Sequence, residues 1–299
     1  MNDLYKKFVV KSYLSTGGFT PFIPNLVHIL PGDFFQIEKG QLKVLGNLFK
    51  DGILDKRDVD LQYDIHQYDE NWDLSEGVDK PFFGQKNIQG EFQEEEKSVR
   101  AFRFECPGSF FFQGKNPKSV KISNWDYLKD QLIIKMTQVL FSFREVYLVT
   151  ESAYLDQWML AVANSREAEL ELRVQMQENG PDLFGHVDAK ALYAKHIECY
   201  KRGSRTSLPF FKAKRLSARD TRNSLASIDA ISSENALVGW ANDAFDFDFR
   251  IEDQLSAPKK YSQIAFIDQL RANELNPTTA LEFFHWTDFN LDDIENLFG

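Results

Sequence analysis

The chain lacks the patterns that mark disulfide-stabilised proteins, helical membrane proteins and secreted proteins. Its two cysteines, Cys106 and Cys199, give no disulfide framework and no metal-ligand spacing, so a reduced, cytoplasmic protein is expected. No run of about 18 apolar residues occurs, which argues against a transmembrane helix. Lys6, Lys7 and Lys11 interrupt the apolar core that a signal peptide needs, so no such peptide is expected.

Motifs of catalysis, cofactor binding and nucleic-acid binding are missing too. The sequence has no glycine-rich phosphate loop, no Walker pattern and no Gly-x-Ser-x-Gly motif. None of the five histidines stands at metal-ligand spacing from another histidine or a cysteine, and Cys199 near His196 is an isolated pair. We therefore expect no catalytic residue, no metal, no cofactor and no enzymatic activity. A net charge of −10 without a recognition motif also disfavours nucleic acid as a partner.

Phenylalanine, by contrast, is abundant. The 299 residues include 27 Phe, far more than such a chain usually carries, in a composition that is otherwise typical of a soluble globular protein. Many of these rings have to be buried or reserved for another apolar environment. The length allows one large domain and a small one.

Charge is distributed unevenly along the chain. Residues 1–216 carry 29 Lys and Arg against 30 Asp and Glu, whereas residues 217–299 carry 6 against 15. The first part ends in a basic stretch, 190–216, with eight basic residues and one acid, Glu198. A basic surface followed by an acidic tail predicts either pairing within the chain or competition between the tail and an anionic partner. Two merely solvated faces would explain the same pattern.

The most informative stretch, 123–162, predicts a helix followed by two strands. Behind a helix cap at Ser123, apolar residues recur at helical spacing, namely Trp125, Leu128, Leu132, Met136 and Val139. Residues 146–149 are too few for a helix and apolar on both faces, which is typical of a strand covered on two sides. A short polar break separates them from a second apolar strand at 154–162.

Alternating polar and apolar residues predict further strands. The alternation is clearest at 58–68, where Val59, Leu61, Tyr63 and Ile65 face one way, and it returns at 168–176. Strands are also expected at 34–37, at 98–112 with a break at Pro107 and Gly108, and at 208–216. The acidic stretch 69–97 is expected to be a long connection. A membrane-crossing strand and a half-exposed strand of a soluble sheet both alternate, and on periodicity alone the soluble sheet is favoured.

Together with a short helix at 3–14, these elements form an α+β pattern rather than a βαβ series. Residues 1–216 are expected to form the first domain, 217–235 a linker rich in small and polar residues, and 236–299 an acidic, mainly helical tail. Tail helices are expected at 233–244, 262–275, 277–286 and 290–298. Their many aromatic residues predict packing against the first domain.

Three short motifs together resemble the pore-forming domain of the gasdermin family. Glu145-Val-Tyr-Leu-Val-Thr-Glu151, between a helix and an alternating strand, is similar to the central segment of that domain. Leu4-Tyr-Lys-Lys-Phe-Val-Val-Lys11, followed by Gly17-Gly-Phe-Thr-Pro-Phe-Ile-Pro24, resembles its basic first helix and the next strand. Leu208-Pro-Phe-Phe-Lys-Ala-Lys-Arg-Leu216 is similar to its closing strand. The motifs span residues 1–216 in the family's order.

The resemblance implies a twisted antiparallel sheet with packed helices over 1–216 and an autoinhibited pore-forming protein, cytoplasmic and monomeric at rest. Removal of the C-terminal segment by a protease would let the protein bind acidic membrane lipids and oligomerise into a β-barrel pore. Such a pore would cause pyroptosis-like cell death in immune defence. Loss of an acidic tail would leave a domain near neutrality with a basic face, which raises affinity for anionic membranes.

Residue by residue, the resemblance assigns membrane binding and cleavage. On the first helix, the lysines 6, 7 and 11 would meet lipid, although docking on the protein core is an equal alternative. The basic stretch would add Lys201, Arg202 and Arg205. Strands around 58–68 and 98–106, and around 156–176 and 187–200, would form two inserting hairpins. Cleavage between 217 and 260 would have Arg219 and Arg222 as candidate sites.

Two features depart from the family, and another class of protein stays open. Bacterial gasdermins often carry an acylated cysteine near the N-terminus, whereas the first cysteine here is Cys106. A tail of about 80 residues matches neither the very short bacterial tails nor the longer mammalian ones. The alternative is a soluble β-rich interaction or structural protein whose acidic helical tail binds a partner.

Overall fold

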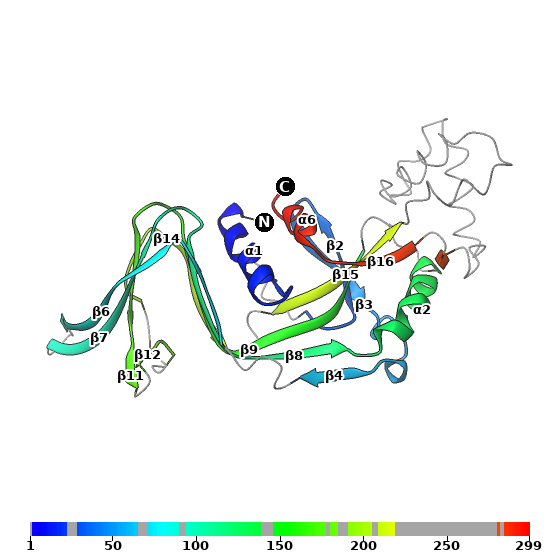
Figure 1. The fold of residues 1–299 in the computed structure, drawn as a ribbon, viewed down its shortest axis with the longest axis horizontal. Helices are drawn as coiled ribbons and strands as arrows, with labels where there is room; N and C mark the ends of the chain where they lie inside the picture. Colours follow the sequence, from blue (N-terminus) through cyan, green and yellow to red (C-terminus); the bar gives the residue numbers. More distant parts are fainter. Residues whose placement is uncertain are drawn as a thin grey trace.

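The computed structural model describes residues 2–22, 29–64, 71–89, 94–138, 146–177, 180–184, 191–204, 209–218, 280–281 and 284–299. Two antiparallel sheets dominate it. A ten-stranded sheet forms the body, and a four-stranded sheet forms an arm that projects from it (Figure 1). A two-stranded ribbon completes the strands, and helices are few. This β-rich antiparallel architecture agrees with the predicted α+β class.

The described helices are the 3-10 helices η1 (Asp3–Tyr5) and η2 (Lys56–Asp58) and the α-helices α1 (Lys6–Ser15), α2 (Trp125–Gln138) and α6 (Leu291–Glu295). The strands in chain order are β1 (Thr20–Pro21), β2 (Asp33–Glu38), β3 (Gln41–Asn47), β4 (Leu61–Asp64), β5 (Trp72–Glu76), β6 (Val78–Gln89), β7 (Glu94–Phe104), β8 (Phe110–Ile122), β9 (Tyr147–Ala163), β10 (Ala168–Arg173), β11 (Gln175–Gln177), β12 (Gly180–Asp182), β13 (Ala191–Lys195), β14 (Ile197–Ser204), β15 (Phe210–Ala218) and β16 (Phe284–Asp288).

Strand β9 is the centre of the body sheet. It is 17 residues long and pairs with β2 and β8 along one edge and with β15 and β14 along the other. Neighbours on both edges and cover on both faces explain why its two ends, 147–149 and 158–163, are unbroken apolar runs. The predicted strands 146–149 and 154–162 are therefore one strand. The polar residues between them stay extended because β8 and β15 pair with them, and Glu151 forms an ion pair with Lys212 at 3.2 Å.

The abundant phenylalanines fill the layers on the two faces of this sheet. On one face, α1 places Phe8 against Phe110 and Phe112, with ring centroids 5.3 and 5.1 Å apart. Helix α2 buries its predicted apolar stripe, including Leu128 and Leu132, in a separate cluster. In the described residues, 15 phenylalanines are buried in the apolar clusters of the protein, where their rings bury large apolar areas.

The acidic stretch 69–97 is not a long connection, as the sequence analysis predicted, but holds β5, β6 and the start of β7. In β5, Trp72 and Leu74 are buried and alternate with the exposed residues Asp73 and Ser75. Strands β6 and β7 are polar in sequence, and they are strands because they pair with each other over ten registered residue pairs. Cross-strand pairing supplied by the fold has outweighed a composition that favours loops.

The strand predicted at 58–68 begins later in the structure than expected. Asp58 ends the 3-10 helix η2, Leu61–Asp64 form β4, which pairs with the end of β8, and residues 65–70 lie outside the described part. Of the predicted apolar face, Val59 is buried, but Leu61 and Tyr63 are 38% and 66% exposed. The apolar face of β4 is thus open to solvent, and β4 does not pair with 98–106.

The C-terminal residues also differ from the prediction. The helix expected at 277–286 is wrong at its end, because Phe284–Asp288 form β16 on the edge of β15. The free backbone groups of that edge explain the strand. Helix α6 falls within the predicted helix 290–298, with Asn290 as its cap. The predicted helices 233–244 and 262–275, and the linker beyond residue 218, lie outside the described residues.

Substitution of one glycine, Gly114 of β8, can measure how tightly β8 and β9 pack. A Cβ added at Gly114 would lie 2.6 Å from Cδ1 of Leu155. We expect Gly114→Ala to lower the free energy of unfolding by about 1–3 kcal/mol. In a Leu155→Ala background, which itself costs about 2–5 kcal/mol, the same substitution should cost less because the clashing methyl groups are gone. Urea unfolding of the four proteins measures this, and strictly additive losses would contradict the packing.

Candidate functional site

The arm is built from two long hairpins that continue out of the body. Strands β5, β8, β9 and β14 are neighbours in the body sheet, and β6, β7, β10 and β13 are neighbours in the arm in the same order. Chain segments 72–89 and 94–122 form the first hairpin, and 147–173 and 191–204 the second. The predicted second hairpin, 156–176 with 187–200, lies within this arrangement. In this structure β6 pairs with 98–104, whereas β4 pairs with β8, and which segments insert into a membrane stays a prediction.

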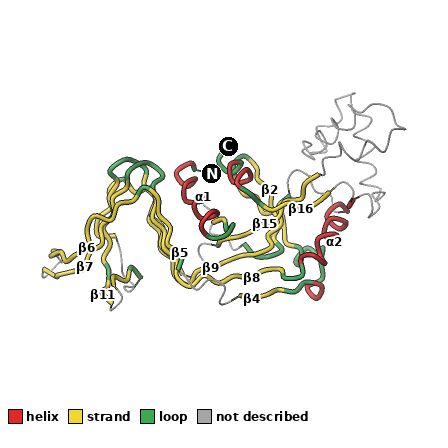
Figure 2. The backbone as a smooth tube through the Cα atoms, viewed as in Figure 1, coloured by secondary structure: helices red, strands yellow, loops and turns green. Residues whose placement is uncertain are grey.

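All four segments bend where they pass from body to arm. Each carries one residue with positive φ at this point, namely Gly77 (61°), Gly108 (77°), Glu167 (56°) and His196 (55°). We call these four residues the bend row. Figure 2 shows loops and turns gathered at the crest that they form. Because a left-handed residue interrupts an extended chain, four of them side by side turn the whole sheet.

Backbone hydrogen bonds tie the four bends together. Glu105 N donates to Gly77 O at 3.0 Å, Gly108 N to Ala163 O at 2.9 Å, and Asn164 N to His196 O at 3.1 Å. The two non-glycine members of the row, Glu167 and His196, each cost about 1–2 kcal/mol in this conformation. Other contacts therefore have to offset the conformational strain of the bend.

One such set of contacts is an apolar cluster inside the bend. It joins residues of the arm, such as Phe102 and Leu170, to residues of the body, such as Phe111 and Met159. The rings of Phe102 and Phe111, on either side of the bend in consecutive strands, have centroids 4.5 Å apart. Burial of these side chains holds arm and body at a fixed angle.

The N-terminal segment holds the bend from another side. The Lys7 ammonium lies 3.2 Å from Cys106 Sγ and 3.8 Å from a carboxylate oxygen of Glu76. Leu4 O lies 3.3 Å from the point where a Cβ of Gly108 would be. Burial, and next a hydrogen bond with Cys199 of β14, raise the pKa of Tyr5. Residues 4–7 thus contact the bending segments 72–89, 94–122 and 191–204, and Leu4 and Tyr5 also pack against the cluster that contains Leu160 and Val162 of β9.

The C-terminal segment, residues 284–299, closes the opposite end of the body. Strand β16 pairs with Lys214–Ala218 of β15, and α6 contacts α1 (Figure 1). Its centre is Asp293, which is fully buried. This carboxylate accepts hydrogen bonds from Arg215 Nη1 at 2.7 Å, Tyr147 Oη at 3.0 Å and the backbone N of Asn290 at 2.9 Å. Because a buried charge is costly without its partners, these three donors fix the position of Asp293.

Two further ion pairs attach the segment to basic residues. Lys6 of α1 binds Glu295 at 2.6 Å, and Lys214 of β15 binds Asp288. Burial, followed by the charges of Asp288 and Asp293, raises the pKa of Tyr13, whose hydroxyl donates to Phe289 O. Of the alternatives that charge distribution left open, pairing within the chain is the one found in the described residues.

The residues predicted to bind membranes have different environments in the structure. Lys6 and Lys7 are engaged as described, and Lys11 is exposed on α1. On β14, Lys201 is exposed, whereas Arg202 is half-buried, donates to Leu183 O at 3.0 Å and lies over the ring of Phe184. Arg205, Arg219 and Arg222 lie outside the described residues.

Other kinds of site are not found in the described part of the chain. It has no group of three or more His, Cys, Asp and Glu residues placed to hold a metal ion. None of its helices has the length and apolar character needed to cross a membrane. Apart from Gly108, where a break was predicted, sequence analysis missed the residues of the bend row, and it also missed Asp293. Only the glycines of the row and the Asn290–Asp293 capping spacing left a signal in the sequence.

Comparison with solved structures adds a likeness of shape. No protein-family model matches the chain, and no curated protein matches it. Among solved structures, the chain is similar to a bacterial gasdermin from Bradyrhizobium tropiciagri, with 10% identity and a TM-score of 0.28, over 71% of this chain and 87% of that chain. A TM-score of this size decides neither family nor function, which must be inferred from the chain's own contacts.

The buried Asp293 should control attachment of the C-terminal segment. Asp293→Ala leaves Arg215 without its partner, a loss of about 3–5 kcal/mol for a buried pair. Amide hydrogen exchange across 284–299 should therefore rise strongly. The matched control is Asp288→Ala, whose exposed pair contributes about 0–1 kcal/mol. Equal exchange in the two variants would contradict the assigned role of Asp293.

The reactivity of the Cys106 thiol should report on the contact between α1 and the bend. Hydrogen bonds with Ser109 and then with Lys7 lower the pKa of this thiol. More thiolate is therefore present at neutral pH than in an ordinary cysteine, and Lys7→Met should raise the pKa and slow alkylation at pH 7 several-fold. The pH dependence of iodoacetamide labelling, in a Cys199→Ala background, measures this. An unchanged midpoint would show that Lys7 is not seated at Cys106 in solution.

Proposed function

We propose that the protein is a pore-forming protein held inactive by its own C-terminal segment. The observation that carries the proposal is that residues 284–299 occupy the β15 edge and the cations Lys6, Lys214 and Arg215 at the same time. Loss of this segment would open a strand edge for pairing with another copy and free a basic surface for anionic lipid.

The hairpins supply the parts that such a pore requires. A strand that crosses a membrane needs about 9–11 residues with alternating faces. Segments 72–89, 94–122, 147–173 and 191–204 all exceed this length if their bends are straightened. In β10, Ala168, Leu170 and Leu172 are buried, while Glu169 and Glu171 are half-buried. Turning such faces outward exposes one apolar side to lipid, and pairing between hairpins satisfies the backbone.

The edge of β15 supports assembly of several copies. Its outer side is now covered by β1 at Phe210 and Phe211 and by β16 at Lys214–Ala218. At the opposite end of the sheet, β3 pairs only with β2 within the described residues. Release of β16 would add an open edge at β15 to the one at β3, and a closed ring of copies requires an open edge at each end of the sheet.

In this proposal the resting protein is a cytoplasmic monomer without enzymatic activity, and a protease activates it. Membrane binding uses Lys6, Lys7 and Lys11 together with the freed cations of β15. Cell death in immune defence is the corresponding biological role. The exposed ion pairs with the tail contribute little energy, so they exchange readily for lipid head groups.

The test is controlled cleavage followed by dye leakage. A recognition sequence for a site-specific protease is inserted after residue 230, and the protein is mixed with vesicles that contain either anionic or only zwitterionic phospholipid. We expect leakage from anionic vesicles only after the cut. Asp293→Ala should accelerate it because the segment leaves more readily, and Asp288→Ala should change it little.

Two outcomes separate the classes of function. Oligomers on anionic vesicles after the cut, with leakage, support the pore. If gel filtration shows that the segment has left and the remaining chain stays folded, monomeric and inert beside both vesicles, the proposal is wrong. The soluble β-rich interaction protein with an acidic tail would then be favoured.

A further inference from the structure

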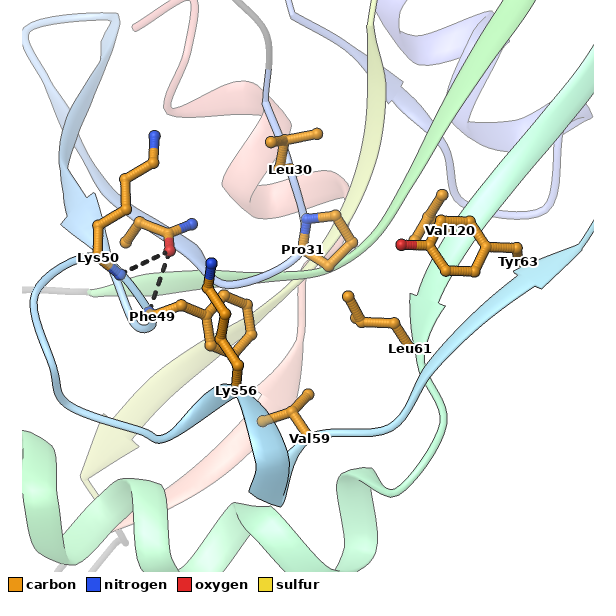
Figure 3. A pocket seen from close by; sticks show the side chains of 10 residues that line it. Leu30, Pro31, Phe49, Lys50, Lys56, Val59, Leu61, Tyr63 and Val120 are labelled. Carbon is orange, nitrogen blue, oxygen red and sulfur yellow. Dashed lines mark hydrogen bonds between the residues drawn. The ribbon is translucent and has the colours of Figure 1, made fainter.

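A pocket of about 430 Å³ lies on the body, and none of its lining residues belongs to the bend row or to the C-terminal segment. Its walls come from the loop before β2, the turn after β3, the segment around η2, and strands β4 and β8 (Figure 3). This volume falls in the lower part of the range of about 300–1,000 Å³ for small-molecule sites. The pocket accommodates one small ligand.

Most of the wall is apolar, and part of this apolar wall is open to solvent. Leu30, Leu61 and Tyr63 line the pocket and are 49%, 38% and 66% exposed. They are among the few large apolar side chains that the described part of the chain leaves exposed. Apolar side chains gathered at one concave place mark a binding groove, whereas single exposed ones need no explanation.

The same pocket carries positive charge. Its lining includes Lys50 and Lys56 and no acidic residue, and both lysines are exposed. Figure 3 shows their side chains on one side of the pocket, with Pro31, Leu61 and Tyr63 on the other.

The carboxylates nearest to these lysines in sequence are occupied. Asp51 accepts a hydrogen bond from the backbone N of Asn47 at 2.8 Å, and Asp55 forms an ion pair with Arg57 at 2.7 Å. Neither Lys50 nor Lys56 has an ion pair with another described residue. The two ammonium groups are therefore available to an anionic ligand.

From this combination we infer that the pocket binds one free, anionic, single-chain amphiphile. Its alkyl chain lies on Leu30, Leu61 and Tyr63, and its acidic head group binds Lys50 and Lys56. An apolar wall alone would take a neutral ligand, and two exposed lysines alone would bind anions weakly. The size of the pocket favours one alkyl chain over the two of a bilayer phospholipid. This site uses no residue of α1, β15 or the C-terminal segment, so it stands or falls apart from the proposed pore.

Three probes on the full chain separate the contributions of tail and head. Dodecyl phosphate has both parts, dodecyl maltoside has the same tail without charge, and inorganic phosphate has the charge without a tail. Isothermal titration calorimetry below micelle-forming concentrations should give one dodecyl phosphate per chain. The other two probes should bind at least about tenfold more weakly, because each loses one of the two interactions.

Variants then locate the site. Lys50→Gln with Lys56→Gln should weaken dodecyl phosphate about tenfold or more, with no change for dodecyl maltoside. Leu61→Gln with Tyr63→Ser should weaken both detergents. Lys39→Gln with Lys195→Gln, which removes two exposed lysines elsewhere, should change nothing. Each pair alters exposed side chains, and circular dichroism checks that the fold persists.

The inference is overturned by any of three results: several molecules of dodecyl phosphate per chain, equal affinity for the charged and uncharged detergents, or affinity unaffected by the Lys50 and Lys56 substitutions. The last result, with one-to-one binding retained, would place the amphiphile at another surface.

Discussion

The structure depends on the pairing of β9 along both of its edges. Because β2 and β8 pair along one edge and β15 and β14 along the other, its 17 residues form one continuous element that links distant parts of the protein. At its start, Tyr147 donates a hydrogen bond to Asp293 of the C-terminal segment. At its end, Ala163 exchanges hydrogen bonds with Gly108 and Ser109 at the bend. The contact that holds the C-terminal segment and the bend of the arm thus lie at the two ends of one strand.

Different forces hold the C-terminal segment and decide what can replace it. Phe284, Phe289, Ile294 and Leu297 are almost completely buried, and their burial supplies most of the attachment. The exposed pair of Lys6 with Glu295 adds little in water. The buried pair of Arg215 with Asp293 mainly fixes position, because either charge left alone would be costly. A negatively charged surface can compete with this segment for the exposed cations, but it cannot replace the buried contacts. Strand and helix must therefore leave the body before Arg215 becomes available.

Sequence reasoning recovered the elements whose periodicity reflects their own burial. Helix α1, helix α2 and strand β15 follow from apolar spacing that matches the faces they bury. It failed for β5 and β6, because long-range pairing rather than an apolar face makes those residues strands. It also failed for β16, where Phe284 and Trp286 suit a helix as well as a strand and the free β15 edge decides. Within the bend row, Gly77 and Gly108 are residues that favour positive φ, whereas Glu167 and His196 adopt it against their preference. No local pattern could have placed them.

The bend row also determines what a change of shape would require. The four segments remain in the same order on both sides of the bend, so straightening needs no exchange of strand partners. It needs a change of φ at four residues, and for Glu167 and His196 this change relieves strain. What opposes it is the apolar cluster around Phe102 and Phe111 and the seat of residues 4–7 against the bend. Transfer of that cluster from a protein interior to another apolar medium would remove the main opposing term, since its burial is then kept. In water, the hydrophobic effect therefore keeps the arm bent.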